Sequence, residues 1–244
     1  MNILSILHSS KKLPPPDKTG LLLPAVREVQ SVIETYTNIK CCKAIIHPPS
    51  MNSREILESI PGVRLPDALF SFYRETEQIE FSWIAAPDYV FGSDFYDGDL
   101  TLLSPADAKN LYLDVMCDIA NEAIQNGWEK NDAGYAALVN DWPHWFPVLL
   151  FANGDCLCID MTSEQNRIVY CEHDVMDGGP NLHGLQIAPD LETLIYRWKQ
   201  MLFAENFDWT RAVDETGINL DSELLTPLVQ AYRKFNPASG SRET

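Results

Sequence analysis

The densest set of residues that could bind a metal ion lies in one short segment after position 170. Its members are His173, Asp174, Asp177 and His183. Imidazole nitrogens and carboxylate oxygens of this kind bind borderline and hard cations. The glycines between these residues leave the relative positions of their side chains open, and the chain has no H-E-x-x-H pair of ligands on a helix. We therefore expect a solvated loop here and no metal site.

The cysteines offer two further kinds of chemistry, metal binding and nucleophilic attack. The chain has six, which are Cys41, Cys42, Cys117, Cys156, Cys158 and Cys171. None forms the C-x-x-C spacing of a zinc knuckle, and Cys156 and Cys158 are expected to be small core residues on one face of a strand. A nucleophilic thiol needs a nearby imidazole. Cys171 and His173 have a spacing that suits a strand but is common by chance, so we expect neither a nucleophile nor a cofactor.

Asp155 and Asp160 could be paired carboxylates for acid–base chemistry. They lie at a predicted turn and a predicted strand end, where aspartates usually accept hydrogen bonds from backbone N–H groups. We therefore expect a structural role for both. The sequence also lacks G-x-S-x-G, Walker and G-x-G-x-x-G motifs, so it contains no evident catalytic device.

The segment from Phe81 to Asp99 mixes aromatic and acidic residues without a regular period, and we expect a loop that binds a protein partner. The candidate contacts are Asp88, Asp94, Tyr96, Asp97 and Asp99. Aromatic side chains supply buried anchors, and carboxylates complement a basic partner. The alternative is that the aromatic residues belong to the core and only the aspartates reach water.

Residues 146–174 predict three short strands joined by two turns. The dipeptide Asn153-Gly154 tolerates positive φ at both central positions of a tight hairpin turn. The first two strands are apolar on both faces, so the sheet should be covered on both sides. Helices are predicted around this cluster, with Pro66 at a first helical position, Ser104 and Asp190 as N-caps, and Gly127 as a stop. The order of helices, then strands, then helices favours an α+β fold.

Composition limits the partners. The formal net charge is -17 and the sequence pI is about 4.5. An acidic surface repels phosphate backbones, so we expect no direct binding to nucleic acid. The charge suits a basic protein partner, or it serves solubility alone. No apolar run reaches transmembrane length, and Lys11 and Lys12 follow the first apolar residues, unlike in a signal peptide. We expect no membrane association, reduced cysteines and a cytoplasmic location.

Several segments, taken in order, resemble the SUKH superfamily, which includes fungal Smi/Knr regulators of cell-wall assembly and bacterial toxin-immunity proteins. The similar segments are residues 56–73, 100–108, 146–160, 167–174 and 187–198. Within them, the Gly-x-x-Leu-Pro step and the central hairpin with its closing aspartate supply the motif residues, which are Gly62, Leu65, Pro66, Asn153, Gly154, Asp155 and Asp160. The resemblance covers residues 51–204, and the chain departs from it at 76–78 and in a longer segment at 109–145.

The resemblance implies a central antiparallel meander sheet packed with flanking helices. It divides the chain into an N-terminal helical extension (1–50), a SUKH-like domain (51–204) and a C-terminal helical extension with a disordered tail (205–244). It implies a binding protein and not an enzyme, namely an immunity protein that neutralises a cognate toxin, typically a basic nuclease, by docking on it. The alternative is an intracellular regulatory scaffold in cell-envelope or signalling control. A hydrolase that uses His173 and His183 is a third, more remote interpretation.

Overall fold

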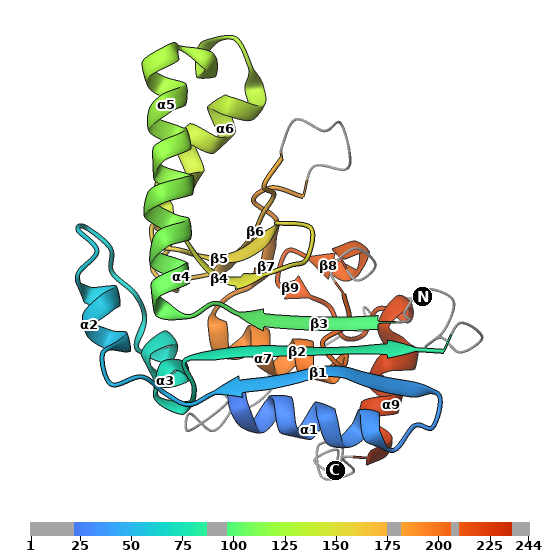
Figure 1. Ribbon diagram of the computed structural model, residues 1–244. Coiled ribbons are helices and arrows are strands. Elements are labelled where there is room, and N and C mark those ends of the chain that lie inside the picture. Colours follow the sequence, from blue (N-terminus) through green and yellow to red (C-terminus); the bar gives the residue numbers. More distant parts are fainter. Residues whose placement is uncertain (1–21, 87–96, 175–181, 206–209, 236–244) are drawn as a thin grey trace, which may run out of the picture.

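The computed structural model describes residues 22–86, 97–174, 182–205 and 210–235 of the 244-residue chain. It confirms the α+β class and the meander. Seven antiparallel strands follow one another in sequence order across one sheet, with helices packed around it (Figure 1). The strands are β1 (Ile39–His47), β2 (Gln78–Ala85), β3 (Asp97–Leu102), β4 (Trp145–Leu150), β5 (Cys156–Asp160), β6 (Ile168–Cys171) and β7 (Gln186–Ala188).

The helices include one, α6, in a segment for which the sequence predicted no helix. They are α1 (Leu22–Glu34), α2 (Ser53–Glu58), α3 (Asp67–Glu75), α4 (Pro105–Asn110), α5 (Asp118–Asn126), α6 (Ala133–Asp141), α7 (Leu191–Gln200) and α9 (Thr226–Phe235). The side chains of Ser104 and Asp190 accept hydrogen bonds from the first turns of α4 and α7, and Gly127 ends α5 with a φ of 69°. Pro66 differs slightly, because it is the N-cap of α3 and not its first residue.

Two apolar clusters cover opposite faces of the sheet. The main core joins the sheet to α1, α3, α7 and α9, and it contains Val29, Phe81 and Trp198. A second cluster covers β4–β6 from the other side, where Met116 and Leu138 come from the helical segment 105–141. All residues of β5 and β6 are buried as a result. The prediction that both faces of this part of the sheet are covered is confirmed.

Both flanking segments belong to the main core. α1 packs against α7 and α9, and β1 is an edge strand of the sheet. Glu28 of α1 receives hydrogen bonds from Tyr232 of α9 and Lys199 of α7, at 2.6 and 2.7 Å. A small two-stranded sheet, β8 (Val213–Asp214) and β9 (Gly217–Ile218), packs beside β7. The division at residues 50 and 205 stays a prediction, but the segments on both sides of these boundaries share one core.

The prediction of a loop from Phe81 to Asp99 is wrong at both ends of that range. Residues 81–85 belong to β2 and residues 97–99 to β3. Phe81 and Trp83 alternate with Ser82 and point into the core, a period of two that the acidic residues nearby obscured. The alternative interpretation, a core role, therefore holds for these two aromatic rings. The predicted contacts Asp88, Asp94 and Tyr96 lie outside the described residues.

The hairpin turn between β4 and β5 has the predicted glycine but another geometry. Gly154 has a φ of 97°, whereas Asn153 is not among the residues with positive φ. Phe151 accepts a hydrogen bond from the Gly154 N–H and donates one to the Asp155 carbonyl, which makes a three-residue loop with a left-handed final position. Asn153 contributes through its side chain, which bonds the backbone N–H and the carboxylate of Asp155.

None of the helices in the described ranges is long and apolar enough to cross a lipid bilayer.

Gly154→Val should lower the free energy of unfolding by about 1–3 kcal/mol, because valine resists positive φ. A Cβ atom here would also lie 3.3 Å from the His173 ring. Urea unfolding measures the effect. Gly62→Val is the matched control for the contact with His173. Gly62 also has a positive φ, 76°, but no atom lies within 4 Å of its Cβ position. Wild-type stability in the Gly154 variant would contradict the turn assignment.

Candidate functional site

The outward face of β2 and β3 differs from the rest of the sheet because it retains contact with solvent. Both strands alternate buried and partly exposed residues, whereas β5 and β6 are buried throughout. The register of the strands aligns Lys43, Ser82 and Asp99 in one row across this face. Ile84, which is 47% exposed, pairs with Asp97 in the next row. Charged, polar and apolar side chains thus share one open surface.

A groove forms on this face where β3 and β4 separate. β3 pairs with β4 at Thr101 and Leu102, its last two residues. Its first residues pair with the segment after α7 instead: the Asp99 N–H donates to the Phe203 carbonyl at 2.9 Å, and Gly98 bridges Ala204. The resulting cavity has a volume of about 470 Å³ and is lined by residues of β1–β3, by residues 150–152 and by Glu205. We call it the acidic groove.

The segment that closes the acidic groove has a strained backbone. Leu202 and Phe203 have φ values of 58° and 54°, in the left-handed region that costs free energy for residues other than glycine. Buried indole groups hold this conformation. Trp83 Nε1 donates to the Leu202 carbonyl at 2.7 Å, and Trp198 Nε1 donates to the Ala204 carbonyl at 3.0 Å. The chain therefore fixes this wall of the groove through its core.

Gly98 allows the close approach of these groups. A Cβ atom at this position would lie 2.3 Å from Trp83 Nε1 and 2.6 Å from the Phe203 carbonyl oxygen. Contacts this short do not occur in folded proteins without displacement of the neighbours. The glycine between Asp97 and Asp99 thus lets Trp83 and the 202–205 segment pack beneath the two carboxylates.

The groove is electrostatically negative. Asp97, Asp99 and Glu205 line it together with one lysine, Lys43, which forms an ion pair with Glu80. Burial raises the pKa of Asp99 to about 6, although Lys43 and a hydrogen bond from Thr101 act in the opposite direction. The fold therefore retains a carboxylate in a position that disfavours its charged form. Carboxylates kept under such conditions cluster at functional sites.

Asp155 and Asp160 lie at opposite ends of β5 and serve separate hydrogen-bond networks. Asp155 accepts hydrogen bonds from the Tyr170 hydroxyl at 2.6 Å and from the His173 N–H at 2.9 Å. Burial acts to raise the pKa of Asp155, but these hydrogen bonds outweigh it and the pKa is lowered. Asp160 has the same balance, with Thr162 and Arg167 as donors. These contacts fit the structural role expected for both residues.

The other motif residues also have structural contacts. Gly62, with a φ of 76°, turns the chain between α2 and α3, Leu65 packs against the main core, and Pro66 caps α3. α2 and α3 lie toward the end of β3 where α4 begins, away from the start of β3 (Figure 1).

The predicted ligands after position 170 have different partners. His173 Nδ1 lies 2.8 Å from Asp155 Oδ1, whereas His183 Nε2 lies 3.2 Å from Asp141 Oδ2. Asp177 lies outside the described residues. Cys171 is buried and His173 is largely exposed, an arrangement that does not favour a thiol nucleophile paired with this imidazole.

A scan against models of protein families, a search of curated proteins and a search of solved structures found no match to this chain. The resemblance to the SUKH superfamily stays a prediction from the residues.

Asp99→Asn should stabilise the protein at neutral pH. The folded-state pKa of about 6 lies above the value of about 3.9 for an unfolded aspartate, so the folded state binds more protons between these values. Wild-type stability attributable to Asp99 therefore falls as pH rises through this window. After allowance for solvent screening, the variant should gain about 1–2 kcal/mol at pH 7 and nothing near pH 3.5.

Urea unfolding at several pH values measures this difference. Asp118→Asn is the matched control, because Asp118 is exposed on α5. A constant difference between wild type and Asp99→Asn across the pH range would show that Asp99 is not the group that titrates.

Proposed function

We propose that this chain is a non-enzymatic binding protein that docks through the acidic groove onto a basic protein. We propose further that the partner is a toxin of the nuclease class and that docking neutralises it. The observation that carries the proposal is Asp99, a partly buried carboxylate with a raised pKa in a groove that also contains Asp97 and Glu205.

The groove suits the insertion of a cationic side chain. Its volume of about 470 Å³ falls within the range of small-molecule sites and exceeds what one arginine side chain needs. A guanidinium group placed there would form charge-assisted hydrogen bonds with the carboxylates and would lower the pKa of Asp99. Ile84 lines the groove, and Ile45 is 43% exposed on β1, so apolar contact is available beside the charged centre. A charged centre with apolar neighbours, once covered by a partner, is typical of residues that dominate binding energy.

Net charge supports a basic partner. The chain carries a formal charge of -17, and opposite charge on the partner would speed diffusional encounter. Nucleases act on polyanions and present basic surfaces to them, so an acidic protein competes for the same surface. The resemblance to the SUKH superfamily points to the same class of function. The regulatory scaffold is the alternative if no toxin is found.

The first test is capture of a partner by the full-length protein from its own source, followed by binding kinetics. Asp97→Asn combined with Asp99→Asn should slow association, weaken its salt dependence and raise Kd at least tenfold, which corresponds to about 1.4 kcal/mol or more. The control is Asp118→Asn with Glu122→Gln, two exposed positions on α5 with the same change in net charge. Equal effects in both variants would assign binding to overall charge and not to the groove.

Binding should also depend on pH. A cation in the groove favours ionised Asp99, so affinity should rise as pH increases through about 6. Asp99→Asn should flatten this part of the profile. A profile unchanged by the substitution would place the partner elsewhere on the molecule.

Tyr96 tests the predicted aromatic anchor. Tyr96→Ala should raise the dissociation rate, with a cost of roughly 2 kcal/mol or more. Unaltered dissociation would remove Tyr96 from the interface. If no toxin is captured and expression protects no cell, the regulatory scaffold replaces the immunity function.

A further inference from the structure

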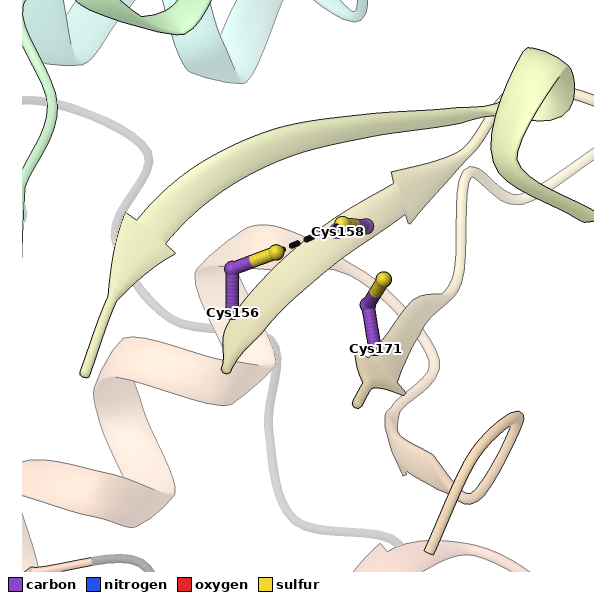
Figure 2. Close-up of side chains that lie close together, drawn as sticks. All are labelled: Cys156, Cys158 and Cys171. Atoms are coloured by element: carbon purple, nitrogen blue, oxygen red, sulfur yellow. Dashed lines mark hydrogen bonds between the residues drawn. The ribbon is translucent and has the colours of Figure 1, made fainter. Parts of the chain in front are cut away.

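Three cysteines converge on the face of the sheet that the helical segment 105–141 covers. Cys156 and Cys158 come from β5 and Cys171 from β6, and Figure 2 shows their side chains gathered on the same side of the two strands. Their sulfur atoms all lie within 4.8 Å of one another, and Cys156 Sγ lies 3.5 Å from Cys158 Sγ. All three are free thiols and at most 4% exposed.

Strand geometry produces this cluster. Residues two apart on a strand point to the same face, which places Cys156 beside Cys158. The antiparallel register then pairs Cys156 with Cys171 on β6. The surroundings are apolar, since Met116, Trp142 and Val169 belong to the same cluster of buried residues. Three ligand-type atoms thus meet in a dry interior.

His183 lies close to this cluster. Its side chain is 4% exposed, and its ring packs against Trp145, another member of the apolar cluster, with 4.7 Å between ring centroids. Neither of its ring nitrogens belongs to the group of ligand atoms within 4.8 Å of one another, which consists of the three sulfur atoms, so His183 lies beside the cluster and not within it. His183 Nε2 lies 3.2 Å from Asp141 Oδ2. A carboxylate that orients the far nitrogen of a histidine is the usual outer partner of a metal-bound imidazole.

We propose that Cys156, Cys158 and Cys171 bind one Zn²⁺ ion and that the side chain of His183 moves to complete a closed, structural site. Three thiolates and one imidazole make a tetrahedral set typical of structural zinc, and thiolate ligands exclude Ca²⁺ and Mg²⁺. A Zn–S distance of about 2.3 Å requires sulfur atoms about 3.8 Å apart, close to the spacing present. Binding displaces the thiol protons to solvent, and Asp141 orients the His183 ring.

This proposal departs from the expectation, drawn from the sequence, that the chain binds no metal and that Cys156 and Cys158 are small core residues. The expectation of no metal considered spacing along the chain, where Cys171 is remote from Cys156. It also grouped His183 with His173, which pairs with Asp155 instead. The three cysteine ligands are adjacent through strand geometry and strand pairing, and the proposal does not depend on the acidic groove.

The experiment titrates the full-length wild-type protein, stripped of metal by a chelator under reducing conditions, with Co²⁺ and then Zn²⁺. One equivalent of Co²⁺ should produce a thiolate-to-cobalt charge-transfer band and the intense visible bands of a tetrahedral site. Zn²⁺ should displace it and raise the Tm. The absence of these bands at one equivalent, with no change in Tm on adding Zn²⁺, would overturn the proposal whatever the variants do.

Variants then identify the ligands. Cys158→Ala should abolish the tetrahedral cobalt spectrum, and Asp141→Asn should weaken Zn²⁺ affinity by about 10–100-fold. The matched controls are Cys117→Ala and His173→Ala, which should bind as the wild type does. An unchanged spectrum in Cys158→Ala would contradict the assignment. So would a Cys156–Cys171 disulfide in freshly purified protein, seen by mass as the loss of two hydrogens, because it would make the cluster a redox pair.

Discussion

The hydrogen-bond register of the meander decides which side chains meet on each face of the sheet, because consecutive strand residues point in opposite directions. One row of paired residues runs from Thr101 through Leu150 and Cys156 to Cys171. The first part of this row lines the acidic groove and the last part lies in the apolar cluster. A slip of one residue on β5 or β6 would turn the thiols of that strand toward the main core. Both candidate sites therefore depend on the same register.

Trp83 links the acidic groove to the main core. Its ring is buried, its Nε1 group holds the strained carbonyl of Leu202, and its position requires a glycine at residue 98. Phe203, which follows, packs edge-on against Phe81 and Trp198. Because such packed groups have few alternative arrangements, the backbone beneath Asp97 and Asp99 is fixed before a partner arrives. A preformed groove avoids the entropy cost of ordering its own backbone during association.

Local signals in the sequence predicted several parts of the fold that depend on neighbouring residues, although α6 was not among them. The cap at Ser104, the stop at Gly127 and the left-handed position at Gly154 each follow from the conformational preferences of one or two residues. The continuous apolar character of β4 and β5 likewise revealed the two-sided burial. Contacts between distant residues were not predictable in this way. The pairing of β3 with residues 203–205 and of Cys156 with Cys171 depends on topology, which single-residue preferences do not encode.

The misassignment of Phe81–Asp99 has the same physical origin. Aspartates are uncommon in strands, and in Asp97-Gly98-Asp99 they flank a glycine, a composition typical of turns. β3 tolerates this composition because the carboxylates point outward while Gly98 accommodates Trp83. The residues that weaken the strand signal are thus the ones that make the groove acidic. This conflict between local preference and observed structure is an independent reason to place function there.

The acidic groove and the cysteine cluster lie on the same face of the sheet, and they differ in how charge is balanced. In the groove, Asp99 stays near solvent and its raised pKa limits the cost of burial, so a partner's cation can restore the ionised form. Among the cysteines there is no such access, because all three are buried. Thiolate ligands there would require a cation within the fold itself, which the proposed Zn²⁺ supplies. Leu150 packs against the cysteine cluster and lines the groove, so a metal that fixes β5 and β6 also stiffens the wall against which the partner would dock.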